Sequence, residues 1–265
     1  MIFSEPGFEL KNTSGRHAIL WLSKIGDIKI RYHREIPDEA DIKEATIKKE
    51  TTGDWFVSFR LETEDDSLPE KPDVDSLDAS NSVGIDPGIL NHLRTSDGKT
   101  VDWLDLEDEY ERLRREKRAL SRKEKGSNNY EKQQVATGKR HIRQKMLDYQ
   151  HKLKTWLVRE YDAVFVEDLN VKGMLEQSHN ACNKQDTAWR QLIILLEYKA
   201  DPYGCHVVQV ESEGTMKECA CCGVETAKPI WVREHSCPSC GFETDRSTNV
   251  SRNVLQRGFS ELGLG

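Results

Sequence analysis

The chain has 265 residues, with 36% hydrophobic and 32% charged side chains and a net charge of −7 at pH 7. This length allows one large domain or two modest ones. The composition excludes a disordered chain, because 6 Trp, 7 Tyr and 7 Phe are enough to form a core. The sequence contains no run of about 18 apolar residues and no signal-like start. We therefore expect a cytoplasmic protein with neither a membrane span nor secretion.

The first 66 residues show the alternation of short β-strands. The pattern predicts strands at 18–22, 28–33, 45–50 and 55–62, the last with Trp55, Val57 and Phe59 on one side. Thr52-Gly53-Asp54 predicts a hairpin turn between the last two strands. Residues 67–81 are acidic and contain two prolines, which predicts a linker after a β-rich region at 1–66.

A second domain is expected from residue 82. It opens with a short apolar strand that carries Asp86 near its end, and segments 90–95 and 100–103 predict the hairpin that follows. A helix is predicted at 107–125, and a second helical arm runs from the break at 126–129 to residue 161, which together form an antiparallel helix hairpin. The remaining predicted elements are a buried strand at 163–166, a helix at 187–200, a strand at 206–210 and a helix at 248–262.

The helix hairpin is strongly basic. Between residues 112 and 154 the chain carries 15 Lys and Arg against 4 Asp and Glu. A basic block in an acidic chain is a candidate polyanion-binding surface, and the alternative is a solvated helix pair whose charges only keep it soluble. The candidate nucleic-acid-binding residues are Arg112, Arg114, Arg115, Lys117, Arg118, Arg122, Lys123, Lys139, Arg140 and Arg143.

Five of the seven cysteines fall between residues 219 and 240. Cys219 and Cys222 form one pair, Cys237 and Cys240 form another, and each pair is followed by a glycine. Two such turns complete a tetrahedral site of four thiolates, which predicts a structural Zn²⁺. A thioredoxin-like redox site is the alternative, but it requires one such motif that opens a helix. Cys221 lies between ligands and is expected to be a spectator.

The order of the predicted elements is that of an α/β, RNase H-like sheet. In such folds acidic residues at strand ends converge, and carboxylate oxygens are suitable ligands for catalytic Mg²⁺. Asp86 and Glu167 are the candidate catalytic residues at these positions. The alternatives are a turn carboxylate before Pro87 and a helix-capping acid beside Asp168.

Several motifs together resemble the TnpB (OrfB-type) proteins of insertion sequences, which are related to the type V CRISPR effectors. In chain order they are Val83-Gly84-Ile85-Asp86-Pro87-Gly88, Leu120-Ser121-Arg122-Lys123, Val166-Glu167-Asp168-Leu169, Gly214-Thr215 with Lys217-Glu218-Cys219, Cys237-Pro238-Ser239-Cys240-Gly241, and Asp245-Arg246 with Asn249 and Asn253. They cover about residues 82–258, and residues 231–237 further resemble haloarchaeal members.

The resemblance implies a RuvC-type nuclease core at 82–213, a zinc ribbon at 214–244 and a final RuvC segment at 245–265. The strands at 1–66 are then the remnant of the family's wedge (oligonucleotide-binding) domain. The family uses a guide RNA from the transposon end to select DNA, which it cuts with Mg²⁺. The basic hairpin would lie along nucleic acid, with an affinity that falls with salt. The oligomeric state is left open.

Two departures from the family pattern bear on activity. The family's third carboxylate is the second Asp of Asp-Arg-Asp-x-Asn, and here Ser247 stands at that position, which leaves Asp245 as the alternative third carboxylate. The chain also lacks the helical recognition region and the first part of the wedge, so we expect a truncated, degenerate relative. Three functions compete: a Mg²⁺-dependent DNA endonuclease, a nuclease-dead RNA- or DNA-binding protein (a repressor or transposition accessory), and a decayed remnant.

Overall fold

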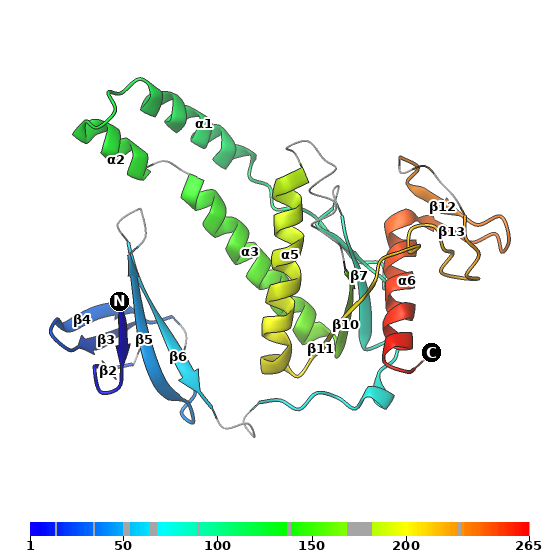
Figure 1. Ribbon diagram of the computed structural model, residues 1–265, viewed down its shortest axis with the longest axis horizontal. Helices are drawn as coiled ribbons and strands as arrows, with labels where there is room; N and C mark the ends of the chain where they lie inside the picture. Colours follow the sequence, from blue (N-terminus) through cyan, green and yellow to red (C-terminus); the bar gives the residue numbers. More distant parts are fainter. Residues whose placement is uncertain are drawn as a thin grey trace. The chain divides into compact units, whose positions relative to one another are not determined.

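The computed structural model describes all residues except 14, 34, 50–53, 64–67, 89–90, 137–138, 169–181, 227–228, 230 and 265, and the side chains of 135–141 and 182–190. The chain divides into two units, Met1–Ser67 with Asp108–Arg140, and Leu68–Glu107 with His141–Gly265 (Figure 1). The sequence instead predicts that residues 107–161 belong to the segment 82–213. The domain boundaries predicted from the sequence remain a prediction. None of the described helices is both long and apolar enough to cross a membrane.

The N-terminal residues form two antiparallel sheets of three strands each. Their strand orders are β1-β5-β6 and β2-β3-β4. The bounds are β1 Ile2–Ser4, β2 Phe8–Lys11, β3 His17–Leu22, β4 Gly26–Arg31, β5 Asp41–Lys49 and β6 Trp55–Glu62. Phe8, Leu20, Leu22 and Ala45 form their buried core. The four predicted strands are confirmed, whereas β1 and β2 were missed because they are too short to show alternation. The predicted turn at 52–54 lies largely outside the described residues.

The predicted helix hairpin contains three helices, with bounds α1 Glu107–Ser121, α2 Asn128–Ala136 and α3 Lys139–Glu160. The break after α1 is confirmed: Gly126 has φ +84°, and the Ser127 hydroxyl accepts from the backbone N–H of Tyr130 at 3.2 Å. This contact caps the start of α2. The predicted second helical arm corresponds to two described helices, α2 and α3. Thr137 and Gly138, between them, lie outside the described residues.

The second unit contains a five-stranded mixed sheet in the order β11-β10-β7-β8-β9. The bounds are β7 Ser82–Pro87, β8 Leu93–Thr95, β9 Thr100–Val101, β10 Ala163–Asp168 and β11 His206–Glu211. Strand β10 runs parallel to β7 and β11, while β7, β8 and β9 are antiparallel neighbours. All five strands were predicted near these positions. The predicted linker also contributes to this unit, because Leu77 is buried in its core.

Helices cover both faces of this sheet (Figure 1). On one face, Val164 and Val166 of β10 pack in a core with Leu157 of α3 and Leu192 of α5 (Cys182–Ala200). On the other face, Ala163 and Phe165 pack against α6 (Arg246–Glu261). Successive side chains of a strand point to opposite faces, so a strand covered on both sides is apolar throughout. This accounts for the uninterrupted apolar run of β10.

Helix α6 lies directly on the sheet because two glycines allow it. A Cβ at Gly258 of α6 would lie 2.0 Å from the Phe165 ring, and a Cβ at Gly84 of β7 would lie 2.1 Å from the Ser251 carbonyl oxygen. Both positions exclude any larger residue without movement of the backbone. This contact sets the position of the α6 N-terminus beside the ends of β7 and β10.

The remaining short elements complete the second unit. They are the 3₁₀ turns Val74–Ser76 and Asp201–Tyr203, and the strands β12 Glu234–Ser236 and β13 Glu243–Asp245. Strands β12 and β13 form an antiparallel pair within the cysteine-rich segment, and β13 leads directly into α6. The cysteine-rich segment is therefore continuous with the helix that covers the sheet.

Candidate functional site

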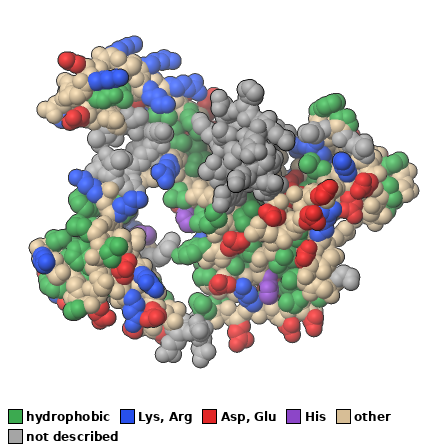
Figure 2. Space-filling model, viewed as in Figure 1, with side chains coloured by type: hydrophobic (Ala, Val, Ile, Leu, Met, Phe, Trp, Pro, Cys, Tyr) green, Lys and Arg blue, Asp and Glu red, His purple; other side chains and the backbone are tan. Residues whose placement is uncertain are grey.

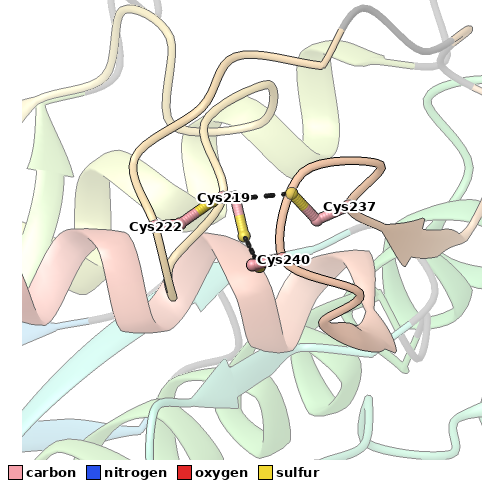
Figure 3. Close-up of side chains that lie close together, drawn as sticks. All are labelled: Cys219, Cys222, Cys237 and Cys240. Atoms are coloured by element: carbon pink, nitrogen blue, oxygen red, sulfur yellow. Dashed lines mark hydrogen bonds between the residues drawn. The ribbon is translucent and has the colours of Figure 1, made fainter.

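The four predicted cysteines form one cluster. The sulfur atoms of Cys219, Cys222, Cys237 and Cys240 all lie within 4.8 Å of one another (Figure 3). The Sγ–Sγ distance is 3.7 Å between Cys219 and Cys240 and 3.6 Å between Cys222 and Cys237. Four thiolates around one tetrahedral Zn²⁺ would lie about 3.8 Å apart, given a Zn–S bond of about 2.3 Å. The cluster is thus compatible with a structural zinc site, and exposed Cys221 is not part of it.

The two halves of the cluster share one backbone geometry. Gly223 and Gly241 have φ +74° and +73°, and each donates its N–H to the carbonyl oxygen of the first cysteine of its pair, at 2.8 and 3.0 Å. The left-handed turn leaves later amides directed at sulfur. The backbone amides of Cys240 and Ser239 lower the pKa of the Cys237 thiol to about 6. Such contacts stabilise the thiolate, the form that binds metal.

Two buried asparagines of α6 hold the cysteine-rich segment. The Asn249 side chain accepts from the Ala220 N–H at 3.0 Å and donates to the Glu218 carbonyl oxygen at 2.7 Å. The Asn253 amide donates to the carbonyl oxygens of Thr215 and Glu218 at 2.9 and 2.8 Å. The sequence marked both asparagines as motif residues without a role. Their role is to satisfy the backbone of the first cysteine turn, which no local pattern could indicate.

The two candidate catalytic carboxylates lie at the ends of neighbouring strands. Val166 of β10 pairs with Ile85 of β7, so Glu167 and Asp86 occupy the next register position of a parallel pair. Ile85 and Val166 pack with α3 and α5, so by alternation both carboxylates face α6. Burial, together with the charge of Glu167, raises the pKa of Asp86 to about 7. Burial also raises the pKa of Glu167, although its Oε1 accepts a hydrogen bond from the Thr215 hydroxyl at 2.5 Å.

Ser247 and Asp245, the two residues considered for a predicted third carboxylate position, lie at the N-terminus of α6. Ser247 lowers the pKa of the Asp86 carboxyl, against the larger effect of burial. Asp245 is the N-cap of α6, and its Oδ1 accepts from the Ser247 N–H at 2.9 Å. The same oxygen lies 3.7 Å from Nη2 of Arg94. No sequence pattern pointed to Arg94, which reaches this place because β8 pairs Arg94 with Asp86.

The predicted nucleic-acid-binding residues are mostly exposed. Figure 2 shows Lys and Arg side chains along α1. In the described part of the chain, the exposed members of the set are Arg112, Arg114, Arg115, Lys117, Arg118, Arg122 and Arg143, and Lys123 is half-buried. Arg112 pairs with Glu116 at 2.9 Å. The side chains of Lys139 and Arg140 lie outside the described residues.

Comparison with known proteins shows to which protein family the chain is related. Residues 58–178 match the OrfB (IS605) family, described as "Probable transposase", and residues 189–254 match the family described as "Cas12f1-like, TNB domain". A Streptomyces pristinaespiralis protein named "Putative RNA-guided DNA endonuclease" is 34% identical over 256 residues, which cover 94% of this chain and 61% of that protein. The chain belongs to the TnpB/OrfB family.

Two other relatives of this TnpB/OrfB chain have names that belong to the same family. Escherichia coli InsQ, which carries the same description, is 27% identical over 93% of the chain and 63% of InsQ. The TnpB-like protein L79 of Acanthamoeba polyphaga mimivirus is 28% identical over 67% of the chain and 37% of L79. The chain therefore spans about three fifths of the length of the Streptomyces and Escherichia relatives.

A solved structure supports the fold. In the cryo-EM structure of a Cas12f1–sgRNA–target DNA complex, the Cas12f1 chain superposes with a TM-score of 0.58 at 14% identity, covering 94% of this chain and 61% of that one. This similarity shows a shared mixed α/β fold, into which the four-cysteine cluster is inserted between β11 and α6.

Proposed function

We propose that the chain is a nucleic-acid-binding protein of the RNA-guided DNA endonuclease lineage. The observation that carries the proposal is the exposed basic face of α1, which includes Arg114, Arg115 and Arg118, in a chain of the TnpB/OrfB family. Exposed arginines bind phosphate oxygens and make affinity depend on salt. The partners we propose are DNA and a guide RNA from the transposon end, which is consistent with the RNA and DNA in the Cas12f1 complex.

The proposal includes a RuvC-type, RNase H-like core at 82–213 with a final segment at 245–265. The sheet order β11-β10-β7-β8-β9, with antiparallel pairs at the β8 and β9 side, supports it. The segment 214–244 would be a zinc ribbon whose Zn²⁺ is held by Cys219, Cys222, Cys237 and Cys240. Residues 1–66 would belong to a wedge (oligonucleotide-binding) domain, joined to the core by the linker 67–81, in a protein that acts in the cytoplasm.

Fluorescence anisotropy with labelled single-stranded RNA and DNA tests this function. The full chain should bind both, and log K should fall linearly with log salt concentration. Triple charge reversal at Arg114, Arg115 and Arg118 should weaken binding and reduce the salt slope by about two to three. Charge reversal at the exposed residues Lys71, Arg159 and Lys217, which lie outside the basic segment 112–154, makes the same change in net charge and should have a much smaller effect. Equal loss in both variants would contradict the proposal.

A second candidate, a Mg²⁺-dependent DNA endonuclease, is favoured by the position of Asp86 and Glu167. Two carboxylates on one face of neighbouring strands are a donor set that Mg²⁺ accepts together with water ligands. When bound there, Mg²⁺ would supply the activation of water and the stabilisation of the leaving oxygen. Asp86 and Glu167 would hold the ion, and Thr215 would orient Glu167. Cleavage that is lost in Asp86→Asn would support this candidate over a nuclease-dead binder.

A further inference from the structure

A polar cluster lies inside the core that joins α3 to the sheet. Lys154 and His92 are fully buried, and Gln150 is 3% exposed. In the part of the chain that the structure describes, Lys154 Nζ, Gln150 Oε1 and both ring nitrogens of His92 have no hydrogen-bond partner. Buried polar groups are paired in the great majority of cases, so three unpaired side chains in one core need a physical explanation.

The three side chains come from two elements. Gln150 and Lys154 are four residues apart on α3, so they lie one above the other on the buried face of this helix. His92 directly precedes β8, and the centroid of its ring lies 4.2 Å from that of Trp103 and 5.4 Å from that of Tyr149. The cluster is thus enclosed by aromatic rings and by the aliphatic side chains of the same core.

A protonated Lys154 would be an unpaired charge in this core. Lys199 of α5, the charged group that acts on Lys154, is also a cation, and burial together with Lys154 lowers the pKa of His92 to about 4, which keeps its ring neutral. On α3 itself the neighbour is the uncharged amide of Gln150. An ammonium group offers three donors and no acceptor, and an unpaired buried charge is costly. The residues that β7 and β10 contribute to this core are apolar: Val83, Ile85, Val164 and Val166.

We propose that Lys154 makes the packing of this part of α3 on the sheet depend on pH. While the amine is neutral, the turn from Gln150 to Lys154 stays packed. When Lys154 takes up a proton, this turn opens locally, because water solvates the ammonium group and the core does not. The device goes beyond the proposed function, and the two carboxylates on the α6 face of the sheet take no part in it.

The direction of the effect follows from proton linkage. The pKa of Lys154 is about 7 in the packed form, mainly because of burial, and has its ordinary value of 10.5 when the side chain is solvated. Between these two values the opened form carries a proton that the packed form lacks. Opening therefore becomes easier as the pH falls toward 7 and changes little below it. The opening constant should rise by at least about tenfold between pH 8.5 and pH 6.

Amide hydrogen exchange of the full chain measures this opening. Protection factors of residues 149–158, which are corrected for the intrinsic pH dependence of exchange, should fall by at least about tenfold from pH 8.5 to pH 6. At pH 6 they should also lie at least about tenfold below those of β10, because a local opening requires less free energy than global unfolding. Protection that is unchanged between the two pH values, or equal in α3 and β10, would overturn the inference.

Three variants separate Lys154 from other titrating groups. Lys154→Met keeps the length of the side chain without its charge and should abolish the pH dependence of exchange. Gln150→Glu places a carboxylate four residues before Lys154, where an ion pair keeps the ammonium group packed, and should reduce the pH dependence to less than about twofold. Lys152→Met, at an exposed position, is the control and should exchange as the unaltered chain does. A pH dependence that persists in Lys154→Met or Gln150→Glu, or that is lost in Lys152→Met, would overturn the inference.

Discussion

The cysteine cluster and the carboxylate pair lie in the same unit but are built differently. The cluster takes its four sulfurs from two turns within 22 residues, Cys219 to Cys240, with matching glycines in each turn. The proposed carboxylate site takes Asp86 from β7 and Glu167 from β10, which lie far apart in the chain, and its predicted third position lies at the start of α6. The ligands of a local site can be predicted from their spacing in the sequence. The residues of an assembled site come from separate elements, so each one has to be predicted by itself, and Ser247 stands where the family resemblance leads us to expect a third carboxylate.

The largest effect is expected where the local site is broken. Cys240→Ser should release about one Zn²⁺ per chain and unfold the segment 214–245, because metal binding and folding of such a module are linked. Metal analysis and limited proteolysis would measure both changes. Exposed Cys221, which lies outside the cluster, provides the control, and Cys221→Ser should retain the metal. Full zinc content in Cys240→Ser would refute the assignment of ligands.

A second change tests the helix that serves both sites. Gly258→Ala should lower the free energy of unfolding by about 3 kcal/mol, because the new Cβ overlaps the Phe165 ring and overpacks the core. Chemical denaturation measures the effect. Ser260→Ala, at an exposed position of the same helix, should change stability by less than about 0.5 kcal/mol. Equal stability of the two variants would mean that α6 does not lie on the sheet as described.

Loss of Asn253 should weaken the link between the two sites. Asn253→Ala removes two hydrogen bonds from buried carbonyl oxygens and should cost about 2 kcal/mol. The resistance of residues 214–245 to protease should fall together with this stability. Gln256, more exposed, donates one such bond, to the Ala220 carbonyl at 2.8 Å, so Gln256→Ala should cost about half as much. A larger loss of stability in Gln256→Ala than in Asn253→Ala would contradict the role of Asn253.

A buried lysine of α3, on the opposite face of the sheet, lies outside both sites. Lys154 of α3 is fully buried, and its Nζ has no hydrogen-bond partner in the described part of the chain. Burial, with a smaller contribution from Lys199, lowers its pKa to about 7. His92, whose pKa is lowered to about 4 by burial and by Lys154, is a second titratable neighbour and is uncharged at neutral pH.

Because the unfolded chain keeps the Lys154 proton up to its ordinary pKa of 10.5, the cost of this lysine is largest below pH 7 and disappears as pH rises to 10.5. Lys154→Met should therefore stabilise the protein by about 1–2 kcal/mol at pH 7, and by less at pH 10. Denaturation at the two pH values measures the difference. Lys152→Met, at an exposed position two residues away, should show no such pH dependence. A gain in stability that does not vary with pH would argue against a buried ammonium.

Much of the fold could be predicted from local patterns, and the failures have physical causes. Strand β10 and the cysteine pairs were predicted because apolar runs and ligand spacing are written in consecutive residues. The division of this arm into α2 and α3 was not predicted, because helix-favouring charged residues continue on both sides of Thr137-Gly138. The roles of Arg94, Asn249 and Asn253 could not be predicted, because each acts on a segment distant in the chain and becomes apparent once α6 packs on β7 and β10.

The most direct test of the comparison between the two sites is Mg²⁺-dependent cleavage of a single-stranded DNA by the unaltered chain and by Ser247→Asp. Both proteins should be zinc-loaded and equally stable, so that the carboxylate site alone differs. We expect the variant to cut the DNA and the unaltered chain to leave it intact. Cleavage by the unaltered chain at the rate of the variant would contradict the claim that Ser247 leaves this site incomplete.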